Sequence, residues 1–526
     1  MSFDAIVVGS GPAGVMAAKA LAGMRTLVVD VGNQAAAAGE GLERNVYEVK
    51  ASGGDAFAAL IGERFESLHN IDRTYLSPKL KAPLVRFVSD GWRQLCPIDV
   101  DGFDPVLSLA TGGLANVWGA GCYRFLDDDL ADFPIRARDL APHYDEVAAH
   151  VGITGTDDDL TRFFGPADGL QPPHRQSRLG GDLARRYARH RAYFHRHGVF
   201  VGAPRMAVLS REHRGRPAYD YQGLEFFKTG IRSIYNPAFT LAELVADGGV
   251  EYRRGVLVER FAAVADGVVV HGRALADGAA FELRARRLVL AAGAVNSARI
   301  ALRSLGDPET ALPLLDNQIS YVPFVNLWHV GRGVEHESLP IQLNVVCVDP
   351  AEPCPLQGSF YGVTATLWND LLFDLPFATR DNIRLLRYLL PAMAVVQMFY
   401  PDRARPENRL RLGADGRLRI DYRARDRGAI ERRLIRVFRR VGHLSLPSLC
   451  KYPDAGNSFH YAGCLPMRSA PGRLQTDASG RLGGEGPVFV ADAANFSSLP
   501  SKNLTMTIMA NALRIGGIVR AELAGS

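Results

Sequence analysis

The stretch Phe3–Asp30, with the sequence FDAIVVGSGPAGVMAAKALAGMRTLVVD, decides the fold. Its first apolar run, Asp4–Val8, predicts a buried strand, and Val15–Leu21 predicts a helix. A second apolar run, Thr26–Val29, predicts another buried strand that ends at Asp30. Strand, glycine turn, helix and strand in this order form the unit that binds dinucleotides. The stretch therefore predicts an α/β protein with a Rossmann-type domain.

The turn between the first strand and the helix supplies candidate residues for binding a pyrophosphate. Gly9 permits the tight turn, Gly11 lets the backbone approach the phosphates, and Gly14 lets helix and strand pack closely. Pro12 and Ala13 complete the turn at the start of the helix. A helix N-terminus offers free N–H groups and a partial positive charge, both of which favour phosphate.

Asp30 lies about 20 residues after the first glycine, where a carboxylate accepts hydrogen bonds from an adenosine ribose. A carboxylate there disfavours a 2′-phosphate, so NADP is the least expected ligand. A glycine turn that binds no nucleotide is the alternative interpretation. Strand, helix and acidic residue in register favour the nucleotide site. The Gly- and Ala-rich run Val31–Gly54 is expected to be a loop that wraps the nucleotide.

Length and composition describe an ordinary folded protein with more than one domain. The chain has 526 residues, of which 47% are hydrophobic and 22% charged, and its net charge is +5. Arginines concentrate in Arg185–Arg216 and Arg403–Arg440. Neither run is interleaved with stacking aromatics, which favours solvated helix faces over a site for anions, and we expect no nucleic-acid partner.

The cysteine and histidine patterns predict no metal site. The six cysteines form no CxxC pair, so free thiols in a reducing compartment are expected. His190, His195 and His197 lie in an Arg-rich run without a carboxylate partner and are expected on a solvated helix face. No secretory signal precedes the first strand, and the apolar run Leu389–Tyr400 is too short to span a membrane. A cytoplasmic protein is therefore expected.

A second glycine-rich segment, Ala110–Cys122 (ATGGLANVWGAGC), indicates that backbone must approach something flat or crowded. It resembles the second flavin motif of the glucose–methanol–choline (GMC) oxidoreductases, and the matching residues are Gly112, Gly113, Asn116, Val117, Trp118 and Gly119. The resemblance implies that this segment lies along the isoalloxazine and pyrophosphate of FAD. Some members attach FAD through a His just before the Trp. Val117 occupies that position here, so non-covalent FAD is expected.

The resemblance extends to later segments that would complete the FAD site. It implies that the backbone of Val258 meets the adenine, and that Ala292 and Gly293 form a strand–turn–helix junction that closes the FAD domain. The closing strand in VFVADAANF (488–496) would bring Asp492 and Ala493 to the ribityl or pyrophosphate region.

The terminal segment SLPSKNLTMTIMANALR (498–514) matches the family's final motif. A helix predicted over Leu504–Ala521 would direct its N-terminus, with Leu504 and Thr505, at the flavin N1 and C2 carbonyl. The partial positive charge there would stabilise the negative charge that forms on reduction.

Two residues are the candidates for chemistry. His460, in the segment SFHYAGC (458–464), resembles the family's base, and its imidazole is suited to take an alcohol proton. Family members pair this His with a second His or an Asn, and this chain has Asn503, whose amide can hold the alcohol oxygen. A buried, satisfied histidine and a simple helix N-cap are the alternatives for the two positions. Lys502 is expected to point away.

Two domains are expected. Residues 1–154, 236–306 and 455–526 would form the FAD-binding domain, and residues 155–235 and 307–454 a substrate-binding domain with an antiparallel sheet. The second includes a hairpin over Asn408–Asp421 and an apolar stretch, Leu367–Phe377, which is a substrate lid, a lipid-facing segment or ordinary core.

The resemblance implies a flavin-dependent alcohol oxidase or dehydrogenase acting on a small-molecule alcohol, with O2 or another electron acceptor. A non-redox FAD-containing lyase or isomerase, a binding protein that retains FAD, and an NAD-dependent reductase are the alternatives. The sequence identifies neither the alcohol nor the acceptor nor the oligomeric state.

Overall fold

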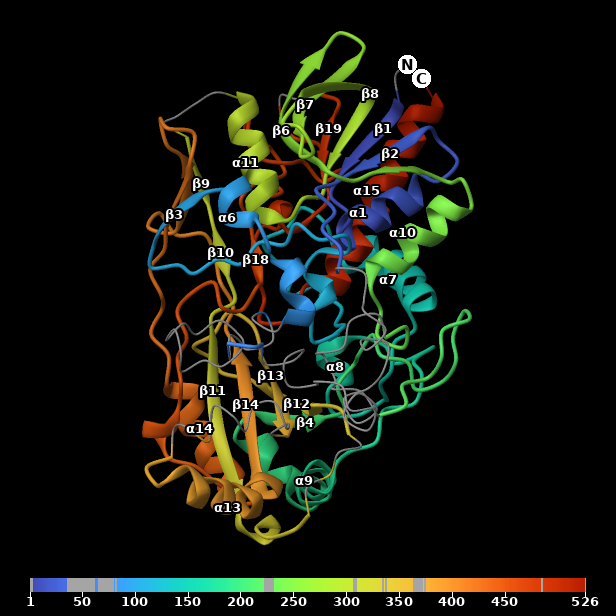
Figure 1. Cartoon of the computed structure of the whole chain (residues 1–526). Coiled ribbons are helices and arrows are strands. Elements are labelled where there is room, and N and C mark those ends of the chain that lie inside the picture. The colour runs from blue at the N-terminus through green and yellow to red at the C-terminus, as the bar shows by residue number, and fades with distance from the viewer. Residues whose placement is uncertain are drawn as a thin grey trace.

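A seven-stranded sheet holds the beginning and the end of the chain in the computed structural model (Figure 1). The described residues are 3–35, 62–64, 80, 83–221, 231–305, 310–333, 335, 338–362, 372, 375–483 and 486–525. The strands of this sheet are β1 (Phe3–Val8), β2 (Thr26–Val29), β5 (Glu251–Arg253), β6 (Val256–Val264), β7 (Gly267–Ala274), β8 (Ala280–Leu290) and β19 (Val488–Val490). They run in the order β5-β2-β1-β8-β7-β6, and β19 also pairs with β8.

The core of this sheet is parallel. β1 pairs in parallel with β2 and β8, β2 pairs with β5, and β19 pairs with β8. Parallel strands place their carboxyl ends at one edge, where α/β proteins bind ligands. β6, β7 and the first half of β8 form an antiparallel extension. The predicted α/β fold with a Rossmann-type sheet is confirmed.

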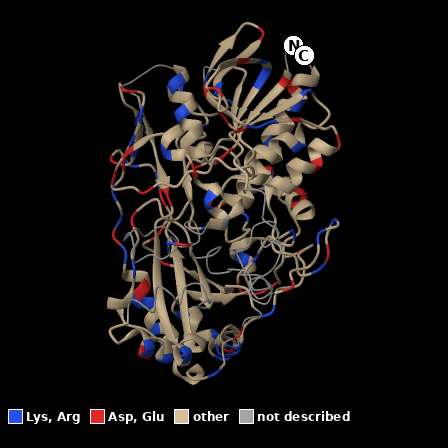
Figure 2. Cartoon of the chain, in the orientation of Figure 1, with Lys and Arg blue, Asp and Glu red and all other residues tan. Residues whose placement is uncertain are grey.

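A second, antiparallel sheet of six strands lies at the other end of the molecule (Figure 1). Its strands, in the order β17-β11-β14-β13-β12-β4, are β17 (His443–Leu444), β11 (Ile319–Asn326), β14 (Met393–Phe399), β13 (Leu356–Gly362), β12 (Ile341–Cys347) and β4 (Val199–Gly202). One face packs on α9 (Arg178–Arg196) and α14 (Ala429–Arg439) in a common core. These helices turn many arginines outward at this end of the molecule (Figure 2).

Two smaller sheets connect the parts. A four-stranded sheet contains β3 (Ile98–Asp101), β16 (Leu418–Asp421), β15 (Arg409–Leu412) and β9 (Ala311–Pro313), and a two-stranded sheet contains β10 (Leu315–Asp316) and β18 (Tyr461–Ala462). The hairpin expected over Asn408–Asp421 is confirmed as β15 and β16. It joins β3 instead of the six-stranded sheet, because its apolar face packs in the core cluster that includes α11 (Ala294–Leu305).

The remaining helices are short or cover the sheets. They are α6 (Trp92–Leu95), α7 (Ala137–Val151), α8 (Thr161–Phe164), α10 (Pro237–Ala246) and α13 (Thr379–Leu389), with 3-10 turns at η1 (Pro83–Val88), η2 (Gly113–Asn116), η4 (Leu327–His329), η5 (Leu390–Ala392), η6 (Pro447–Leu449) and η7 (Ala493–Asn495). The loop expected over Val31–Gly54 and the apolar stretch Leu367–Phe377 lie mostly outside the described residues.

One expectation about the histidines is wrong. His195 on α9 does have a carboxylate partner, because its Nε2 lies 3.1 Å from Asp159 Oδ2. Tyr187 and Arg191 bind the same carboxylate, so a loop distant in sequence converges on α9. All six cysteines are free, as expected. Within the described residues no group of three His, Cys, Asp or Glu could hold a metal, and no helix is long and apolar enough to cross a membrane.

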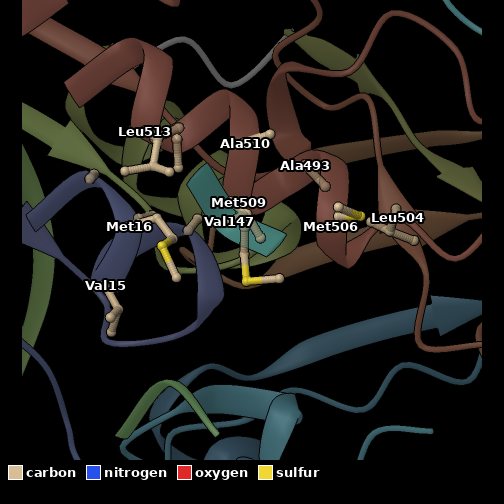
Figure 3. Packing of buried hydrophobic residues seen from close by; sticks show 14 of the residues in the cluster. Val15, Met16, Val147, Ala493, Leu504, Met506, Met509, Ala510 and Leu513 are labelled. Atoms are coloured by element: carbon tan, nitrogen blue, oxygen red, sulfur yellow. The ribbon is translucent and has the colours of Figure 1, made fainter. Parts of the chain in front are cut away.

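The packing of α1 (Pro12–Ala20) on α15 (Thr505–Gly525) joins the two ends of the chain. Figure 3 shows Met16 of α1 in one cluster with Met509 and Leu513 of α15. Helix α1 begins at Pro12, before the expected Val15, because proline fits the first turn of a helix without losing a hydrogen bond. The approach is closest at Gly516, where an added Cβ would lie 2.7 Å from Ala20 Cβ and 2.9 Å from Ala17 O.

Two neighbouring glycines of α15 provide a matched test of this packing. Gly516→Ala should destabilise the protein by about 1–3 kcal/mol, because the methyl group overpacks the contact with α1. Gly517 has no atom within 4 Å of an added Cβ, so Gly517→Ala should stabilise by up to ~1 kcal/mol through helix propensity. Thermal unfolding of both variants measures the difference. Equal melting temperatures would contradict the packing.

Candidate active site

The first glycine turn lies at the carboxyl end of β1 and requires its glycines. Gly9 has a φ of +103°, and a Cβ there would lie 2.4 Å from Ala291 O. A Cβ on Gly14 would lie 1.9 Å from Gly9 O. At Gly11, by contrast, an added Cβ would meet only Gly113 Cα, at 4.0 Å. No side chain caps α1, which begins at Pro12 and Ala13, so no side-chain oxygen binds the N–H groups at its N-terminus.

The second glycine segment approaches the first from the side. Gly112 and Gly113 have φ values of +88° and +62°, and a Cβ on Gly113 would lie 3.3 Å from Gly11 Cα. Two chain segments about 100 residues apart therefore meet backbone to backbone, as the glycine spacing indicated.

The polar side chains of this segment hold its shape. Asn116 Nδ2 donates to Thr111 O at 2.9 Å and Gly113 O at 2.8 Å, and its Oδ1 accepts from Asn236 Nδ2 at 2.8 Å. Trp118 Nε1 donates to Tyr235 O at 3.0 Å. Asn116 and Trp118 therefore fix the shape of this loop.

The apolar members of the motif also contact protein. Val117 packs against a small cluster formed by Val85 and Val88 of η1. A Cβ on Gly119 would meet Ile341 Cδ1 of the six-stranded sheet at 3.7 Å. The segment thus runs from the first glycine turn toward the six-stranded sheet.

Ser10 is a residue that the motif analysis missed. Its backbone N–H donates to Asp30 Oδ2 at 3.0 Å and its hydroxyl also donates to that oxygen, while Gly112 N–H donates to Ser10 Oγ at 3.3 Å. Ser10 therefore links Asp30 to both glycine turns. Burial raises the pKa of Asp30 to about 6 against the effect of these bonds. The variable position between two motif glycines gave no signal for this role.

Two further turns meet at the ends of β8 and β19. Asp492 accepts from Gly293 N at 2.8 Å, Ser297 Oγ at 2.6 Å and Ala494 N at 2.9 Å, and burial raises its pKa to about 6. The carboxylate thus binds the Ala292–Gly293 turn to the turn at Ala493. An added Cβ on Gly293 would point into open space. A contact of Asp492 with a flavin stays a prediction.

Val258 lies on β6, and its backbone carbonyl accepts from Arg299 Nη2 at 3.0 Å. The start of β6 is bonded to the residue that follows β2, because Val256 N–H donates to Asp30 O at 3.1 Å. Its expected contact with adenine also stays a prediction.

His460 lies next to Phe399, the last residue of β14. The two rings are stacked, with centroids 5.1 Å apart and planes at 19°. Burial lowers the pKa of His460 to about 4. The preceding residue, Phe459, has a φ of +60°, which is uncommon for a residue with a side chain.

The loop before His460 is held by a buried carboxylate on β10. Asp316 Oδ1 accepts from Ser458 Oγ at 2.6 Å, and Oδ2 accepts from Gly456 N at 2.9 Å. Ser458 Oγ in turn accepts the backbone N–H of His460 at 3.0 Å. Burial raises the pKa of Asp316 to about 7.

Asn317 determines which nitrogen of His460 carries the proton. Asn317 Nδ2 donates to Tyr400 O at 2.8 Å and to Pro500 O at 2.9 Å. Its remaining atom, Oδ1, lies 3.2 Å from His460 Nδ1 and can only accept, so Nδ1 is protonated. The lone pair of Nε2 is then free to take a proton. The sequence gave no signal for Asn317, which lies outside every motif.

Asn503 lies beside the unprotonated nitrogen of His460. Its Oδ1 accepts from Gln357 Nε2 of β13 at 3.2 Å, which leaves Nδ2 as the donor that points at His460 Nε2, 3.5 Å away. A Cβ on Gly121 would lie 3.2 Å from Asn503 Cγ, so the second glycine segment also reaches this point. Asn503 and Leu504 precede α15, which begins at Thr505, one residue later than the predicted Leu504, and the side chain of Asn503 makes these contacts instead of a simple cap.

A row of uncharged, hydrogen-bonded side chains extends from His460 along the six-stranded sheet. Tyr361 hydroxyl donates to Gln397 Oε1 at 3.1 Å, and Gln397 Nε2 donates to Tyr321 hydroxyl at 3.4 Å. Tyr321 and Gln397 are paired across β11 and β14, on the face opposite the core shared with α9 and α14. Burial raises the pKa of Tyr321 to about 12, so the row is uncharged.

Two solved structures resemble the whole chain. One is an FAD-dependent oxidoreductase from Chaetomium thermophilum, solved with a bound fragment, with a TM-score of 0.59 and 13% identity over 99% of both chains. The other is pyridoxine 4-oxidase from Mesorbium loti, with a TM-score of 0.56 and 13% identity over 98% of both chains. The chain shares the fold of these two enzymes. No family model and no curated protein matches the sequence.

Lys502 points away from His460, as expected. Its ammonium group pairs with Asp129 and also donates to Arg124 O at 3.3 Å, and both charged side chains are buried. Asp129 also accepts from Leu126 N at 2.7 Å. The ion pair therefore fixes the residue next to Asn503 against a segment far away in the sequence.

Replacing Lys502 should be strongly destabilising. Lys502→Met leaves the carboxylate of Asp129 buried without its charge partner, which should cost about 3–5 kcal/mol. Lys451→Met is the control, because Lys451 is exposed and should tolerate the change. Denaturant unfolding of the two variants tests the pair, and a Lys502→Met protein as stable as Lys451→Met would refute it.

Proposed function

We propose that the chain is an FAD-dependent oxidoreductase of the GMC type that oxidises an alcohol to a carbonyl. In this proposal residues 1–154, 236–306 and 455–526 form the FAD-binding domain, and residues 155–235 and 307–454 bind the substrate. The observation that carries it is the pair of His460 Nε2 and Asn503 Nδ2, 3.5 Å apart, with the proton of His460 fixed on Nδ1. The shared fold and the glycine motifs support the same function.

The residues at the end of the parallel sheet fit a non-covalent FAD. An added Cβ on Gly293 meets open space and one on Gly11 meets only Gly113 Cα, at 4.0 Å, although Gly9 and Gly14 beside them are tightly enclosed. The uncapped N-terminus of α1 suits a pyrophosphate, and Asp30 suits a ribose. Gly112 and Gly113 would line the path from pyrophosphate to isoalloxazine, with Val117 where a covalent His would stand. When bound there, the flavin supplies the acceptor for the hydride that leaves the alcohol carbon.

An alcohol hydroxyl group can form hydrogen bonds with both His460 Nε2 and Asn503 Nδ2. The alcohol oxygen can accept from Asn503 Nδ2 and donate its proton to His460 Nε2, in place of their long mutual contact. As the C–H bond breaks toward the acceptor, the O–H proton moves to His460 and the carbon–oxygen bond becomes a carbonyl. The electrons then pass to O2 or another acceptor. His460 and Asn503 are the catalytic residues of this proposal.

Two neighbouring side chains fix the orientations of His460 and Asn503. Gln357 orients the amide of Asn503, and Asn317 orients the ring of His460. Because burial lowers the pKa of His460 to about 4, its ring is neutral, and therefore able to take a proton, throughout the neutral range. The uncharged row of Tyr321, Gln397 and Tyr361 favours a neutral small-molecule alcohol.

Anaerobic mixing of the yellow protein with a panel of alcohols tests the reaction. A substrate should bleach the flavin, and His460→Ala should slow the bleaching by about 100- to 10,000-fold, because the proton acceptor is lost. His190→Ala, on α9, is the matched control and should bleach at the wild-type rate. A flavin that stays yellow while substrate is converted would indicate a lyase or isomerase. A purified protein without a flavin spectrum would refute FAD binding.

The pH dependence of kcat/KM tests Asn317 as a positioning residue. The wild-type rate should fall only near the lowered pKa of His460, about 4, because the neutral ring is active and the protonated ring is not. Asn317→Asp places a carboxylate beside Nδ1, stabilises the imidazolium, and should move this acid limb upward by about 1 unit or more. Asn317→Ala loses the same donated bonds without the charge and should not shift the limb upward. Identical limbs in both variants would contradict the assignment.

A further inference from the structure

The end of the six-stranded sheet that is remote from His460 exposes a group of apolar side chains. Strand β11 begins beside Phe399 and ends at Asn326, and η4 follows it directly. Leu327, Trp328, Tyr388 and Leu446 expose 62%, 51%, 61% and 60% of their surface. These residues, with Ile383 and Leu444, are called the distal patch.

Three segments of the chain, 323–333, 375–392 and 439–452, build the distal patch as one surface. A Cβ on Gly442 would lie 1.9 Å from the ring of Trp328, so that ring lies directly on the third segment. Gly331 N–H donates to Tyr388 O at 2.8 Å, which joins the first segment to the second. Val325 pairs with Leu444 across β11 and β17, which joins the first to the third.

Helix α13, in the second segment, exposes apolar and basic side chains next to one another. Asn382 and Leu386 are buried, and Asn382 Nδ2 donates to Leu375 O and Phe377 O at 3.0 and 2.9 Å, which fixes the start of the helix. Ile383 and Tyr388 are exposed beside exposed arginines. A helix with exposed aromatic and aliphatic groups among arginines is typical of one that lies in a membrane interface.

The charge around the distal patch is mainly positive, although Asp182 of α9 contacts His329 beside it. The three segments contain six arginines and one lysine, all exposed, and a single acidic residue, Asp381. Their net charge of +6 exceeds the +5 of the whole chain, so the remainder of the protein sums to −1. Figure 2 shows Lys and Arg residues on the helices at this end of the molecule, with some Asp and Glu residues among them. Glu335, in the turn after the first segment, pairs with Arg178 of α9.

We propose that the distal patch binds the surface of an anionic lipid bilayer. Its apolar and aromatic side chains would enter the interface while the arginines contact lipid phosphates and acidic headgroups. A second copy of the chain is the less suitable occupant, because a two-fold contact would bring two surfaces of charge +6 together. The proposal concerns attachment, and it is independent of the reaction at His460.

Sedimentation with lipid vesicles tests the proposal. The full-length protein should sediment with phosphatidylcholine vesicles that contain phosphatidylglycerol, should not sediment with pure phosphatidylcholine vesicles, and should be released by high salt. Arg384→Glu with Arg387→Glu should weaken the binding by at least about tenfold. Arg284→Glu with Arg473→Glu changes the net charge equally at exposed sites away from the patch and should bind like the wild type.

Fluorescence and mass measurements decide the remaining outcomes. Anionic vesicles should shift the tryptophan emission to the blue, and Trp328→Phe should remove most of that shift. The proposal is overturned if the wild type does not bind anionic vesicles or if both double variants lose binding equally. It is also overturned if light scattering shows a dimer that Ile383→Ser with Tyr388→Ser converts to a monomer.

Discussion

The buried amide of Asn317 is the interaction on which the reacting end of the site depends. It joins the end of β14 through Tyr400 O, the loop before α15 through Pro500 O, and the ring of His460. An amide has two donors and one acceptor group on opposite sides, so binding two carbonyls leaves it a single orientation. That orientation sets the protonation of His460, whose Nε2 faces the Asn503 amide that Gln357 orients. Asn317 and Gln357 therefore position the two side chains.

The glycine turns at the end of the parallel sheet depend on a different constraint, the close approach of backbone segments. Four turns, at the ends of β1, β8 and β19 and in the segment that begins at Gly112, meet within van der Waals distance. The carboxylates of Asp30 and Asp492 hold these turns through Ser10, Ser297 and backbone N–H groups. Each turn can form locally, but their contacts exist only because the seven-stranded sheet and the segment that begins at Gly112 bring them together.

The molecule separates its charges by position. Around His460, burial lowers the pKa of the histidine and raises the pKa values of Tyr321 and Asp316. The exposed arginines of the distal patch lie at the opposite end of the six-stranded sheet, around exposed apolar groups. A neutral imidazole suits proton transfer, whereas an exposed cationic surface suits attachment to anions. One sheet thus connects two surfaces of opposite character.

The sequence alone determined the parallel β1–α1–β2 unit and the need for glycine at Gly9 and Gly14, because such features depend on neighbouring residues. It also singled out His460 and Asn503 by resemblance, and the structure brings the two side chains together. It could not identify Asn317, Gln357 or Ser10, since an isolated polar residue carries no local signal of its distant partners. It also placed the hairpin β15–β16 with the antiparallel sheet of the substrate-binding domain, whereas the hairpin pairs with β3, and it left His195 without Asp159. Those contacts form only in the tertiary structure, because they join segments that lie far apart in the sequence and carry no local pattern that predicts their pairing.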